Sequence, residues 1–458
     1  MTPDLAADEL PLAAVVVIGL GVTGQAVVQA LQAHGIAVSV VDDHPSDEVR
    51  AAAASLGVDL LEGLTELDLA TVLAGSDALL PSPGVPDRHP AFVAAERAGV
   101  PVLSEFDLAA RWDHRPIVAI TGTDGKTTVT TMVTEMLTAS GRRAVACGNT
   151  DTPLVEAIAD PATEVFVVEA SSFRLGHSRR FRPDVAVWLN FAPDHLDVHD
   201  SLSAYEAAKA RIWSDLREGE GLAVANAEDP VVLANRNASA DTVTFGLEGS
   251  DADATVVGGR LCLPDGTSIL AVDELPRALP HDVANALAAS VAAVAAGADL
   301  DAVRSVLRSF RGLPHRVQLV AEADGVRWYD DSKATTPHAT LAAVSGFDSV
   351  VLLAGGRNKG LDLRPLADAV PPIRAAIAMG DAAEEVADAL DGRCPVERVT
   401  TGMADVVAAA ARLAAPGDAV LLSPGCTSFD WFRSYSERGD AFAAEVRALV
   451  GAGGGERT

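Results

Sequence analysis

Residues 117–128 read IVAITGTDGKTT, and the following residues, VTTMVTEMLTAS, have a helical pattern. The run IVAI is typical of a buried strand, so GTDGKTT occupies a strand-to-helix turn, which is the context of a phosphate-binding loop. The general loop motif has a glycine where this chain has Ile120, but the GxxGKTT core is intact. Backbone N–H groups and the helix N-terminus favour a polyphosphate there, with Lys126 at the β/γ-phosphates and Thr127 at Mg²⁺. The alternative is a structural turn that contains a lysine.

Three blocks of the chain each alternate short apolar strands with helical segments. The first contains AAVVVIGLGVTGQAV and AVSVVDD, the second runs from RPIVAITG to EGLAVANAEDP, and the third contains VRWYDDSKAT and SVVLLAGGRNKG. Such alternation predicts an α/β protein with parallel sheets. We expect three domains: a Rossmann-like domain (1–113), a central P-loop ATPase-like domain (114–314) and a second Rossmann-like domain (315–458). Residues 240–280 have less helical pattern and could add a small antiparallel flap.

Composition limits the classes of function. The chain has 458 residues, of which 49% are hydrophobic and 22% charged, with a formal net charge of -29. This balance is that of a globular enzyme, and the negative charge argues against a nucleic-acid or anionic-membrane surface. Any anionic ligand must therefore be held locally by a few cations, backbone N–H groups or a metal ion.

Cysteine spacing and the N-terminus indicate a cytoplasmic protein. The four cysteines are far apart and form no CxxC pair, so neither a disulfide framework nor a zinc site is predicted; they are Cys147, Cys262, Cys394 and Cys426. The N-terminal MTPDLAADELP is acidic and lacks the basic region of a signal peptide. Residues 283–298 are apolar but alanine-rich, so we expect a buried helix rather than a membrane span.

The stretch GLGVTG (19–24) fits the GxGxxG pattern between a strand and a helix. Asp42 and Asp43 end the next strand about 20 residues later, which is the spacing of a ribose-binding acid in a dinucleotide fold. By itself the motif favours an NAD enzyme. A nucleotide diphosphate such as a uridine diphosphate uses the same kind of turn, and a purely structural turn is the third interpretation.

Polar residues also follow the strands of the central block. Glu169 ends the strand EVFVVE, where a carboxylate beside a phosphate loop can bind Mg²⁺; a helix cap or surface acid is the alternative. The segment NFAPDHLDVHD (190–200) looks like a site because it is dense in oxygen and imidazole donors: Asn190, Asp194, His195, Asp197 and His199. The spacing does not decide which of the two histidines matters. Lys209, in the helical run AYEAAKARIW, reads as a solvent-exposed lysine.

The third block adds several cations and a few acids after its strands. His315 and Arg316 follow a proline turn, Asp331, Lys333 and Thr335 follow the strand VRWY, and Lys359 lies in a glycine-rich loop. Cations that face one cleft would compensate for the acidic chain where anions bind.

Together, these motifs resemble the Mur ligase family. The quoted elements occur in the order GLGVTG, SPG, TGTDGKTT, EASSF, AAKARIW, GLPHR, DDSKAT and LLSPGCTSFDWF, and the resemblance spans essentially the whole chain. DSKAT is its most discriminating element. The resemblance implies an ATP-dependent peptide synthase that joins D-glutamate to UDP-N-acetylmuramoyl-L-alanine through an acyl phosphate. This reaction belongs to peptidoglycan synthesis, which serves the cell wall, cell shape and cell division. The resemblance further implies a monomer without nucleic-acid partners or membrane insertion.

The resemblance also assigns roles to individual residues. In the first domain and the adjoining loop, the UDP substrate would be bound by Val22, Thr23, Asp42, Asp43, His44, Gly84 and Asn149. ATP would be bound by Gly122, Thr123, Asp124, Gly125, Lys126, Thr127, Thr128, Asn285, Arg316, Asp331 and Lys333. Two Mg²⁺ ions would involve Thr127, Glu169, His195 and Lys209. The same comparison makes Lys126, His195 and Lys209 catalytic and Lys209 a candidate for carbamylation. The D-glutamate pocket would consist of Thr335, Lys359, Ser428 and Tyr435.

The sequence departs from the family pattern at Asp124, Asp282 and His44. Two other classes compete with the ligase interpretation. An NAD-dependent oxidoreductase would leave GTDGKTT and Glu169 unused, and a non-catalytic nucleotide sensor would need neither Glu169 nor Lys209. A folylpolyglutamate synthase would share the ATP site, but we would not expect it to carry the N-terminal GxGxxG domain.

Overall fold

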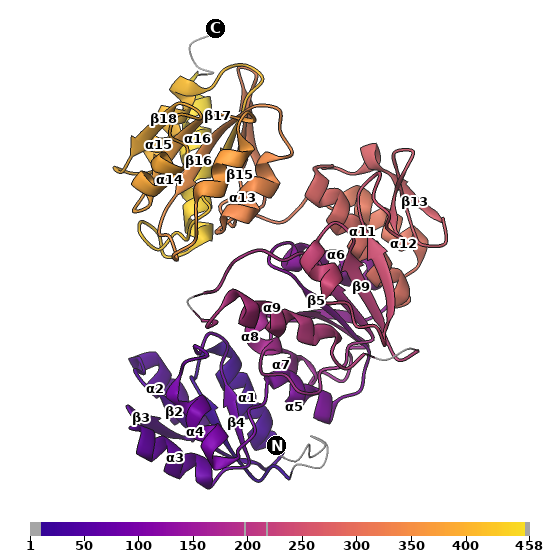
Figure 1. The fold of residues 1–458 in the computed structure, drawn as a ribbon, viewed down its shortest axis with the longest axis vertical. Helices are drawn as coiled ribbons and strands as arrows, with labels where there is room; N and C mark the ends of the chain where they lie inside the picture. The colour runs from indigo at the N-terminus through magenta and orange to yellow at the C-terminus, as the bar shows by residue number, and fades with distance from the viewer. Residues whose placement is uncertain (1–10, 197, 217–218, 454–458) are drawn as a thin grey trace. The chain divides into compact units, whose positions relative to one another are not determined.

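The computed structural model describes residues 11–196, 198–216 and 219–453. The acidic residues 1–10 and Asp197 therefore lie outside the described part. The chain divides into two compact units: Met1–Phe191, His195–Glu274 and Ala284–Ser309 form the first, and Ala192–Asp194, Leu275–Val283 and Phe310–Thr458 form the second. Each predicted domain contains one main sheet (Figure 1), and the predicted α/β class with parallel sheets is confirmed.

The first sheet is parallel and has the strand order β3-β2-β1-β4. Its strands are β1 (Ala14–Ile18), β2 (Ala37–Asp42), β3 (Asp59–Glu62) and β4 (Ala78–Pro81). The predicted strands are present; β3 was not predicted, because it is a short edge strand whose side chains are exposed or half-buried. Strand order reverses between β1 and β4, and at such a point parallel sheets bind ligands.

Helices connect and cover the strands of this sheet. They are α1 (Val22–Ala33), α2 (Asp47–Leu56), α3 (Glu66–Ala74), α4 (Pro90–Ala98) and α5 (Glu105–Trp112). The GLGVTG turn joins β1 to α1, and its tightness requires glycine. Gly19 has φ 78°, and a Cβ at Gly24 would lie 2.2 Å from the Gly19 carbonyl oxygen.

The central sheet is also parallel and has the order β10-β9-β8-β5-β7-β6. Its strands are β5 (Ile117–Thr121), β6 (Ala144–Gly148), β7 (Val165–Glu169), β8 (Val185–Trp188), β9 (Leu222–Asn226) and β10 (Asp241–Phe245). Every residue of β5, β7 and β8 is buried, which explains why these strands read as continuous apolar runs.

The helices around the central sheet include the predicted buried helix near residue 283. They are α6 (Lys126–Ala139), α7 (Leu154–Ala157), α8 (Ser172–Leu175), α9 (Leu202–Ala210), α10 (Pro230–Ala234), α11 (Pro280–Ala295) and α12 (Leu300–Ser309), with 3₁₀ turns at Arg211–Trp213 and Val272–Glu274. Among the described residues, no helix is long and apolar enough to cross a membrane.

The predicted antiparallel flap is present in part of residues 240–280. Strands β11 (Thr255–Val257), β12 (Arg260–Cys262) and β13 (Ser268–Ala271) form a small antiparallel sheet. However, β10 lies in the same stretch and pairs in parallel with β9 in the central sheet. The flap is therefore shorter than the compositional pattern indicated.

The sheet of the second unit has the order β14-β15-β19-β16-β17-β18, and only β14 is antiparallel to its neighbour. The strands are β14 (Gln318–Ala323), β15 (Val326–Asp330), β16 (Val350–Gly355), β17 (Ile373–Met379), β18 (Val396–Val399) and β19 (Ala419–Leu422). The two edge strands β14 and β18 were not predicted. The helices are α13 (Pro337–Val344), α14 (Ala383–Ala389), α15 (Met403–Leu413) and α16 (Tyr435–Gly453), with a 3₁₀ turn at Arg364–Ala369.

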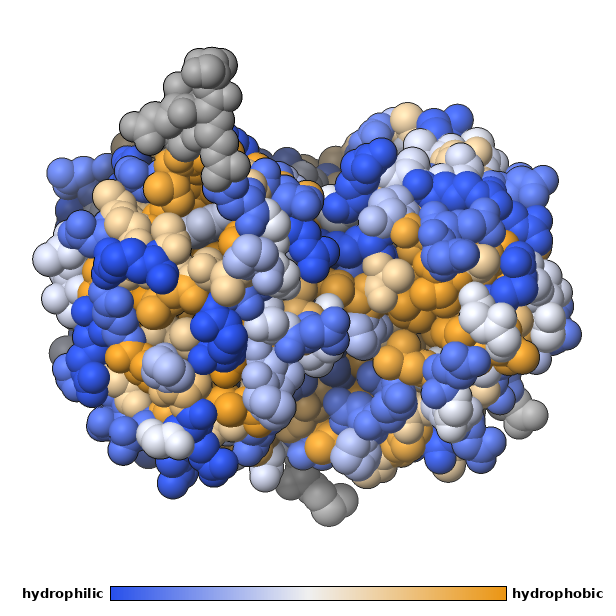
Figure 2. Space-filling model, turned by 90° about the horizontal axis from the view of Figure 1, so that it is seen from above, coloured by the Kyte–Doolittle hydropathy of each residue, from blue (hydrophilic) through white to orange (hydrophobic). Residues whose placement is uncertain are grey.

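The hydrophobic core lies between these sheets and their helices. In the central part, Trp188 and Trp213 are almost completely buried and pack with a centroid distance of 5.3 Å. The face drawn in Figure 2 mixes hydrophilic and hydrophobic residues. Large exposed hydrophobic side chains such as Val22, Leu67 and Phe429 belong to different segments of the chain.

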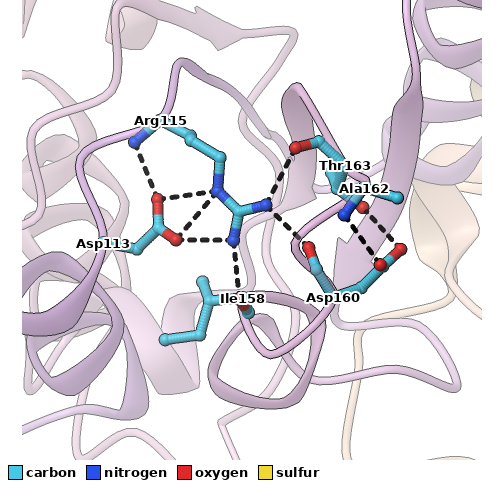
Figure 3. Close-up of polar contacts among 6 residues, drawn as sticks. All are labelled: Asp113, Arg115, Ile158, Asp160, Ala162 and Thr163. Atoms are coloured by element: carbon cyan, nitrogen blue, oxygen red, sulfur yellow. Dashed lines mark hydrogen bonds and ion pairs between the residues drawn. The ribbon is translucent and has the colours of Figure 1, made fainter.

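A cavity of about 390 Å³ lies at the amino ends of the central strands, where β5 begins. Arg115 lies on the wall of this cavity, and Figure 3 shows the hydrogen bonds of its guanidinium to other residues of the protein. Its guanidinium donates to both carboxylate oxygens of Asp113 and to the carbonyl oxygens of Ile158, Asp160 and Thr163. Arg115 therefore connects the segment before β5 to the loop before β7 through hydrogen bonds.

We predict that Arg115→Met lowers the free energy of unfolding by about 2–4 kcal/mol, because three carbonyl groups and a half-buried carboxylate lose their hydrogen bonds from the guanidinium. Urea unfolding followed by tryptophan fluorescence measures the change. The matched control is Arg182→Met, since Arg182 is an exposed residue on the same cavity wall. The control should change stability by less than about 0.5 kcal/mol. Equal effects of the two substitutions would contradict the assigned role of Arg115.

Candidate active site

The polar residues that follow the central strands are brought together by strand register. Ile120 of β5 pairs with Glu169 of β7, Gly148 of β6 also pairs with Glu169, and Thr121 pairs with Trp188 of β8. These parallel strands therefore end at the same level. The phosphate-binding loop, Asn149, Glu169 and Asn190 all lie at the carboxyl ends of these strands. The cavity beside Arg115 lies at the opposite, amino ends of the strands.

The loop between β5 and α6 has the conformation of an anion-binding turn. Gly125 is left-handed (φ 83°) and precedes α6, whose N-terminus has no side-chain cap. Lys126 Nζ donates to the carbonyl oxygens of Gly122 (2.8 Å) and Thr123 (2.7 Å). Thr127 is half-buried and Thr128 is buried in the first turn of the helix. An uncapped helix start with an adjacent lysine is suited to a polyphosphate.

Asn190 holds this loop in place. Its Oδ1 accepts hydrogen bonds from the backbone N–H groups of Thr123 (3.0 Å) and Asp124 (2.9 Å), and its Nδ2 donates to the Asp124 carbonyl oxygen (3.2 Å). Sequence alone marked Asn190 only as one polar residue after a strand. Its function as a brace depends on the parallel alignment of β5 and β8.

Two further residues of the predicted nucleotide site lie near the loop. A Cβ at Gly125 would lie 2.8 Å from Asn285 Oδ1, so the start of α11 approaches the phosphate loop closely. Asp124, one of the departures from the family pattern, is half-buried and has its backbone groups bound to Asn190.

Glu169 is a buried carboxylate with one unused oxygen. The residue is 3% exposed; Oε1 accepts a hydrogen bond from Asn149 Nδ2 (3.0 Å), and Oε2 has no hydrogen-bond partner among the described residues. A buried carboxylate oxygen without a donor is unfavourable unless a cation satisfies it. The described residues contain no group of three or more His, Cys, Asp or Glu that could hold a metal ion. Mg²⁺ usually keeps water and substrate phosphate ligands, so one protein carboxylate fits this ion.

The structure distinguishes the two histidines that spacing could not separate. His199 is buried, and both ring nitrogens are engaged: Nδ1 with Asp87 Oδ2 (3.0 Å) and Nε2 with Ser172 Oγ (2.9 Å). His199 is therefore structural. His195 is half-buried in a left-handed conformation (φ 56°), with its ring edge-on to Phe173 at 4.7 Å.

The interpretation of Lys209 as a solvent-exposed lysine is wrong. Lys209 is 1% exposed; its Nζ donates to the Gly122 carbonyl oxygen (2.7 Å) and lies 4.6 Å from the centre of the Tyr205 ring. Tyr205 OH in turn lies 3.2 Å from Thr123 Oγ1. The helical pattern of residues 202–210 identified the helix but not the face against which it packs, because the phosphate loop that covers Lys209 is distant in sequence.

Most of the residues expected to bind the UDP substrate lie at the carboxyl ends of strands β1, β2 and β4 of the first sheet. Thr23 is buried at the start of α1, whereas its neighbour Val22 is 64% exposed. Asp42 Oδ1 accepts from the backbone N–H of the exposed His44 (3.1 Å). Asp43 lies 3.0 Å from His89 Nε2, a partner that the sequence did not indicate. Gly84 follows β4 with φ 90°.

Asn149 and Thr23 share a partner that sequence reasoning missed. Arg174 Nη1 donates to Asn149 Oδ1 and Arg174 Nη2 donates to Thr23 Oγ1, both at 2.8 Å. The adjacent EASSF motif was singled out in the sequence, but nothing in the local pattern indicates where the following arginine points.

In the second unit, Arg316, Asp331 and Lys333 lie close together. Burial raises the pKa of Asp331 to about 7, although hydrogen bonding to Ser423 and the charge of Arg316 oppose this effect. Arg316 Nε is buried without a hydrogen-bond partner among the described residues. Lys333 Nζ lies 5.2 Å from the centre of the Tyr435 ring.

The remaining residues of the predicted D-glutamate pocket differ in their surroundings. Thr335 is half-buried, Ser428 is 2% exposed, and Lys359 Nζ donates to Asp194 Oδ1 (2.7 Å). Asp282, another departure from the family pattern, is bound by both Nε and Nη2 of Arg277.

We predict that Asn190→Ala weakens the binding of a non-hydrolysable ATP analogue by about 5–30-fold, because the N–H groups of Thr123 and Asp124 lose the side-chain oxygen that accepts from both, and the Thr123 N–H keeps only the backbone carbonyl oxygen of residue 190. Isothermal titration calorimetry measures the affinity. Asn226→Ala is the matched control: Asn226 is the last residue of β9 in the central sheet and is half-buried, but its Nδ2 donates to the Leu189 carbonyl oxygen. An equal loss of affinity in both variants would refute the role of Asn190 as a brace of the loop.

We also predict that the Asp331 carboxyl titrates near pH 7, and ¹³C NMR of the carboxyl carbon, assigned with Asp331→Asn, measures this midpoint. Because the pKa is raised from its ordinary value of 3.8, the stability that this residue contributes is complete below pH 3.8 and is lost as pH rises toward 7. Asp362 serves as an internal reference, since Arg364 lowers its pKa to about 2. A midpoint near 4 for Asp331 would contradict the prediction.

Family models match three consecutive parts of the chain. The Mur ligase MurD-like N-terminal domain matches residues 13–104, the Mur ligase middle domain residues 120–293, and the Mur ligase glutamate ligase domain residues 315–426. The UDP-N-acetylmuramoylalanine–D-glutamate ligase of Frankia casuarinae is 45% identical over 95% of this chain and 94% of the relative. The same-named protein of Thermobifida fusca is 41% identical over 95% of this chain and 98% of its own length.

Solved structures agree at the level of the fold. A pseudomurein peptide ligase type C from Methanothermus fervidus has a TM-score of 0.60 at 18% identity and covers 95% of this chain and 99% of its own. A UDP-N-acetylmuramate-alanine ligase from Thermotoga maritima has a TM-score of 0.54 at 20% identity and covers 96% of this chain and 100% of its own. With the matching domain models and the two relatives along nearly its whole length, the chain belongs to the Mur ligase family.

Proposed function

We propose that the chain is an ATP-dependent ligase that joins D-glutamate to UDP-N-acetylmuramoyl-L-alanine in peptidoglycan precursor synthesis. The observation that carries the proposal is the edge of the central sheet, where an uncapped phosphate loop with Lys126 lies beside Glu169 and its unpartnered carboxylate oxygen. The names of the relatives supply the substrates. An NAD oxidoreductase or a nucleotide sensor would not need both features.

ATP would be held by backbone N–H groups at the start of α6 and by Lys126. Lys126 now bonds to two loop carbonyl groups, and a γ-phosphate would offer it a charged partner instead. Asn285 would contact the nucleotide from α11, and its closeness to Gly125 supports this assignment. Arg316, Asp331 and Lys333 of the second unit would complete the set.

Two Mg²⁺ sites would involve Thr127, Glu169, His195 and Lys209. Glu169 Oε2 fits such an ion because it is buried and lacks a donor. Lys209 fits only after carbamylation, which would replace its positive charge by a carboxylate-like group beside the Gly122 carbonyl. Bound Mg²⁺ would supply charge stabilisation for the transferred phosphoryl group.

The chemistry proceeds in two steps. The L-alanyl carboxylate attacks the γ-phosphorus of ATP, so a carboxyl–phosphate bond forms while the bond to ADP breaks. Lys126 stabilises the charge that develops on the transferred phosphoryl group. The D-glutamate amine then attacks the acyl-phosphate carbonyl carbon, loses a proton, and inorganic phosphate leaves as the amide forms. Exclusion of water protects the acyl phosphate from hydrolysis.

The proposal also assigns the residues that would bind the two substrates. Val22, Thr23, Asp42, Asp43, His44, Gly84 and Asn149 would bind the UDP substrate, and Thr335, Lys359, Ser428 and Tyr435 would bind D-glutamate. We further propose domain boundaries at 1–113, 114–314 and 315–458, a monomeric state and a location in the cytoplasm.

We predict that phosphate release from ATP requires both UDP-N-acetylmuramoyl-L-alanine and D-glutamate and falls by about 100-fold or more in Lys126→Ala, because the transferred charge loses its cation. A coupled phosphate assay measures the rate. Arg182→Met is the control, since Arg182 is exposed beside the opposite edge of the sheet. If no combination of substrates releases phosphate while a nicotinamide cofactor binds, the ligase proposal fails.

A further inference from the structure

Arg174 is a buried cation that joins three separate segments of the first unit. It is 5% exposed and lies on α8, which packs against α5, while α7 packs against α1 and α5 (Figure 1). Arg174 Nε donates to Glu105 Oε1 (3.0 Å), Nη1 to Asn149 Oδ1 (2.8 Å) and Nη2 to Thr23 Oγ1 (2.8 Å). One guanidinium thus contacts α5, the loop after β6 and the first turn of α1.

Glu105 is the countercharge that makes this burial tolerable. Its side chain is 2% exposed, and its second oxygen accepts from the backbone N–H of Val155 (2.9 Å). A buried arginine requires such a paired and hydrogen-bonded carboxylate. The ion pair holds the guanidinium in place, so the N–H groups on Nη1 and Nη2 have fixed directions.

The contact with Asn149 determines how that amide is oriented. A guanidinium has only donors, so Asn149 must present its oxygen to Arg174 and its NH₂ group to the opposite side. There Asn149 Nδ2 donates to Glu169 Oε1 (3.0 Å). Because Oε1 is occupied in this way, Glu169 keeps Oε2 as the oxygen without a donor. Arg174 therefore acts on Glu169 through one intervening side chain.

The contact with Thr23 has an equivalent consequence. Thr23 Oγ1 accepts the Arg174 N–H, so the hydroxyl proton of Thr23 points elsewhere and can be donated to another acceptor. Thr23 lies in the first turn of α1, directly after the glycine-rich turn that ends β1, and strand order reverses between β1 and its neighbour β4. An anionic phosphate oxygen at this turn would be an acceptor for that proton.

We infer that Arg174 is a positioning residue that orients Thr23 toward the UDP substrate and, through Asn149, orients Glu169 toward a divalent cation. The inference rests on the proposed function for the identity of the two ligands. Arg174 would touch neither ligand itself. Its contribution is the fixed donor geometry that a planar guanidinium provides and a lysine cannot reproduce.

The first experiment measures binding rather than turnover, using Arg174→Lys, which retains the positive charge beside Glu105. We expect its dissociation constant for UDP-N-acetylmuramoyl-L-alanine to rise about tenfold by calorimetry, because lysine cannot bond to all three partners. The dissociation constant for Mn²⁺, measured by electron paramagnetic resonance with a non-hydrolysable ATP analogue present, should rise by a similar factor. Arg179→Lys is the matched control, since Arg179 is an exposed arginine whose Nε bonds to the Val102 carbonyl oxygen. The control should change neither constant by more than about twofold.

A second experiment separates positioning from general stabilisation. If Arg174 acts on the cation through Asn149, then Arg174→Lys combined with Asn149→Ala should bind Mn²⁺ no more weakly than Asn149→Ala alone. By the same logic, Arg174→Lys combined with Thr23→Val should bind the UDP substrate no more weakly than Thr23→Val alone. Multiplicative losses in both double variants would overturn the inference, as would unchanged binding of both ligands by Arg174→Lys.

Steady-state kinetics distinguishes this inference from the proposed function. We expect Arg174→Lys to raise KM for the UDP substrate and the Mg²⁺ requirement while leaving KM for D-glutamate within about twofold of wild type. A uniform change in all three constants together with a lower unfolding midpoint would indicate a structural role and overturn the inference. If the wild type binds both ligands but shows no turnover, the proposed function fails, and the two binding experiments still decide the role of Arg174.

Discussion

The parallel register of β5 with β7 and β8 is the constraint on which the candidate site depends. It brings the phosphate loop, Asn149, Glu169 and Asn190 to one edge of the central sheet, although these residues come from four different strand ends. The backbone hydrogen bonds of buried strands cannot slip without moving apolar side chains into the wrong positions. The alignment of the site is therefore maintained by the hydrophobic core beneath it.

Buried positive charges are compensated by nearby oxygen atoms in a chain whose net charge is -29. The buried cations of the first unit each contact oxygen atoms at close range: Lys209 contacts a loop carbonyl, and Arg174 contacts a carboxylate, an amide and a hydroxyl. Such contacts compensate for the loss of hydration. The same cations set the orientation of their neighbours, so that the electrostatics and the geometry of the site are connected.

Local sequence patterns predicted much of the fold and part of the site. The predicted strands and the phosphate loop follow from apolar runs that end in glycine-rich turns, and Glu169 from its place at the end of such a run. The edge strands β3, β6, β14 and β18 were missed because edge strands carry a weaker apolar pattern, and the edge strand β10 lies in the stretch that was expected to form a flap. Lys209 was misread as exposed. Arg174 was missed because Thr23 lies 151 residues away from it in the sequence.

The sequence by itself determined which residues could carry the chemistry, because glycine, lysine and carboxylate residues at strand ends form a local pattern within a few residues. Only the tertiary structure decided which of them act together. It buried Lys209 under the phosphate loop, made His199 structural, left Glu169 with an unpartnered oxygen and linked Arg174 to two parts of the site. The physical reason is that burial and hydrogen-bond direction depend on partners distant in the chain, which no local pattern records.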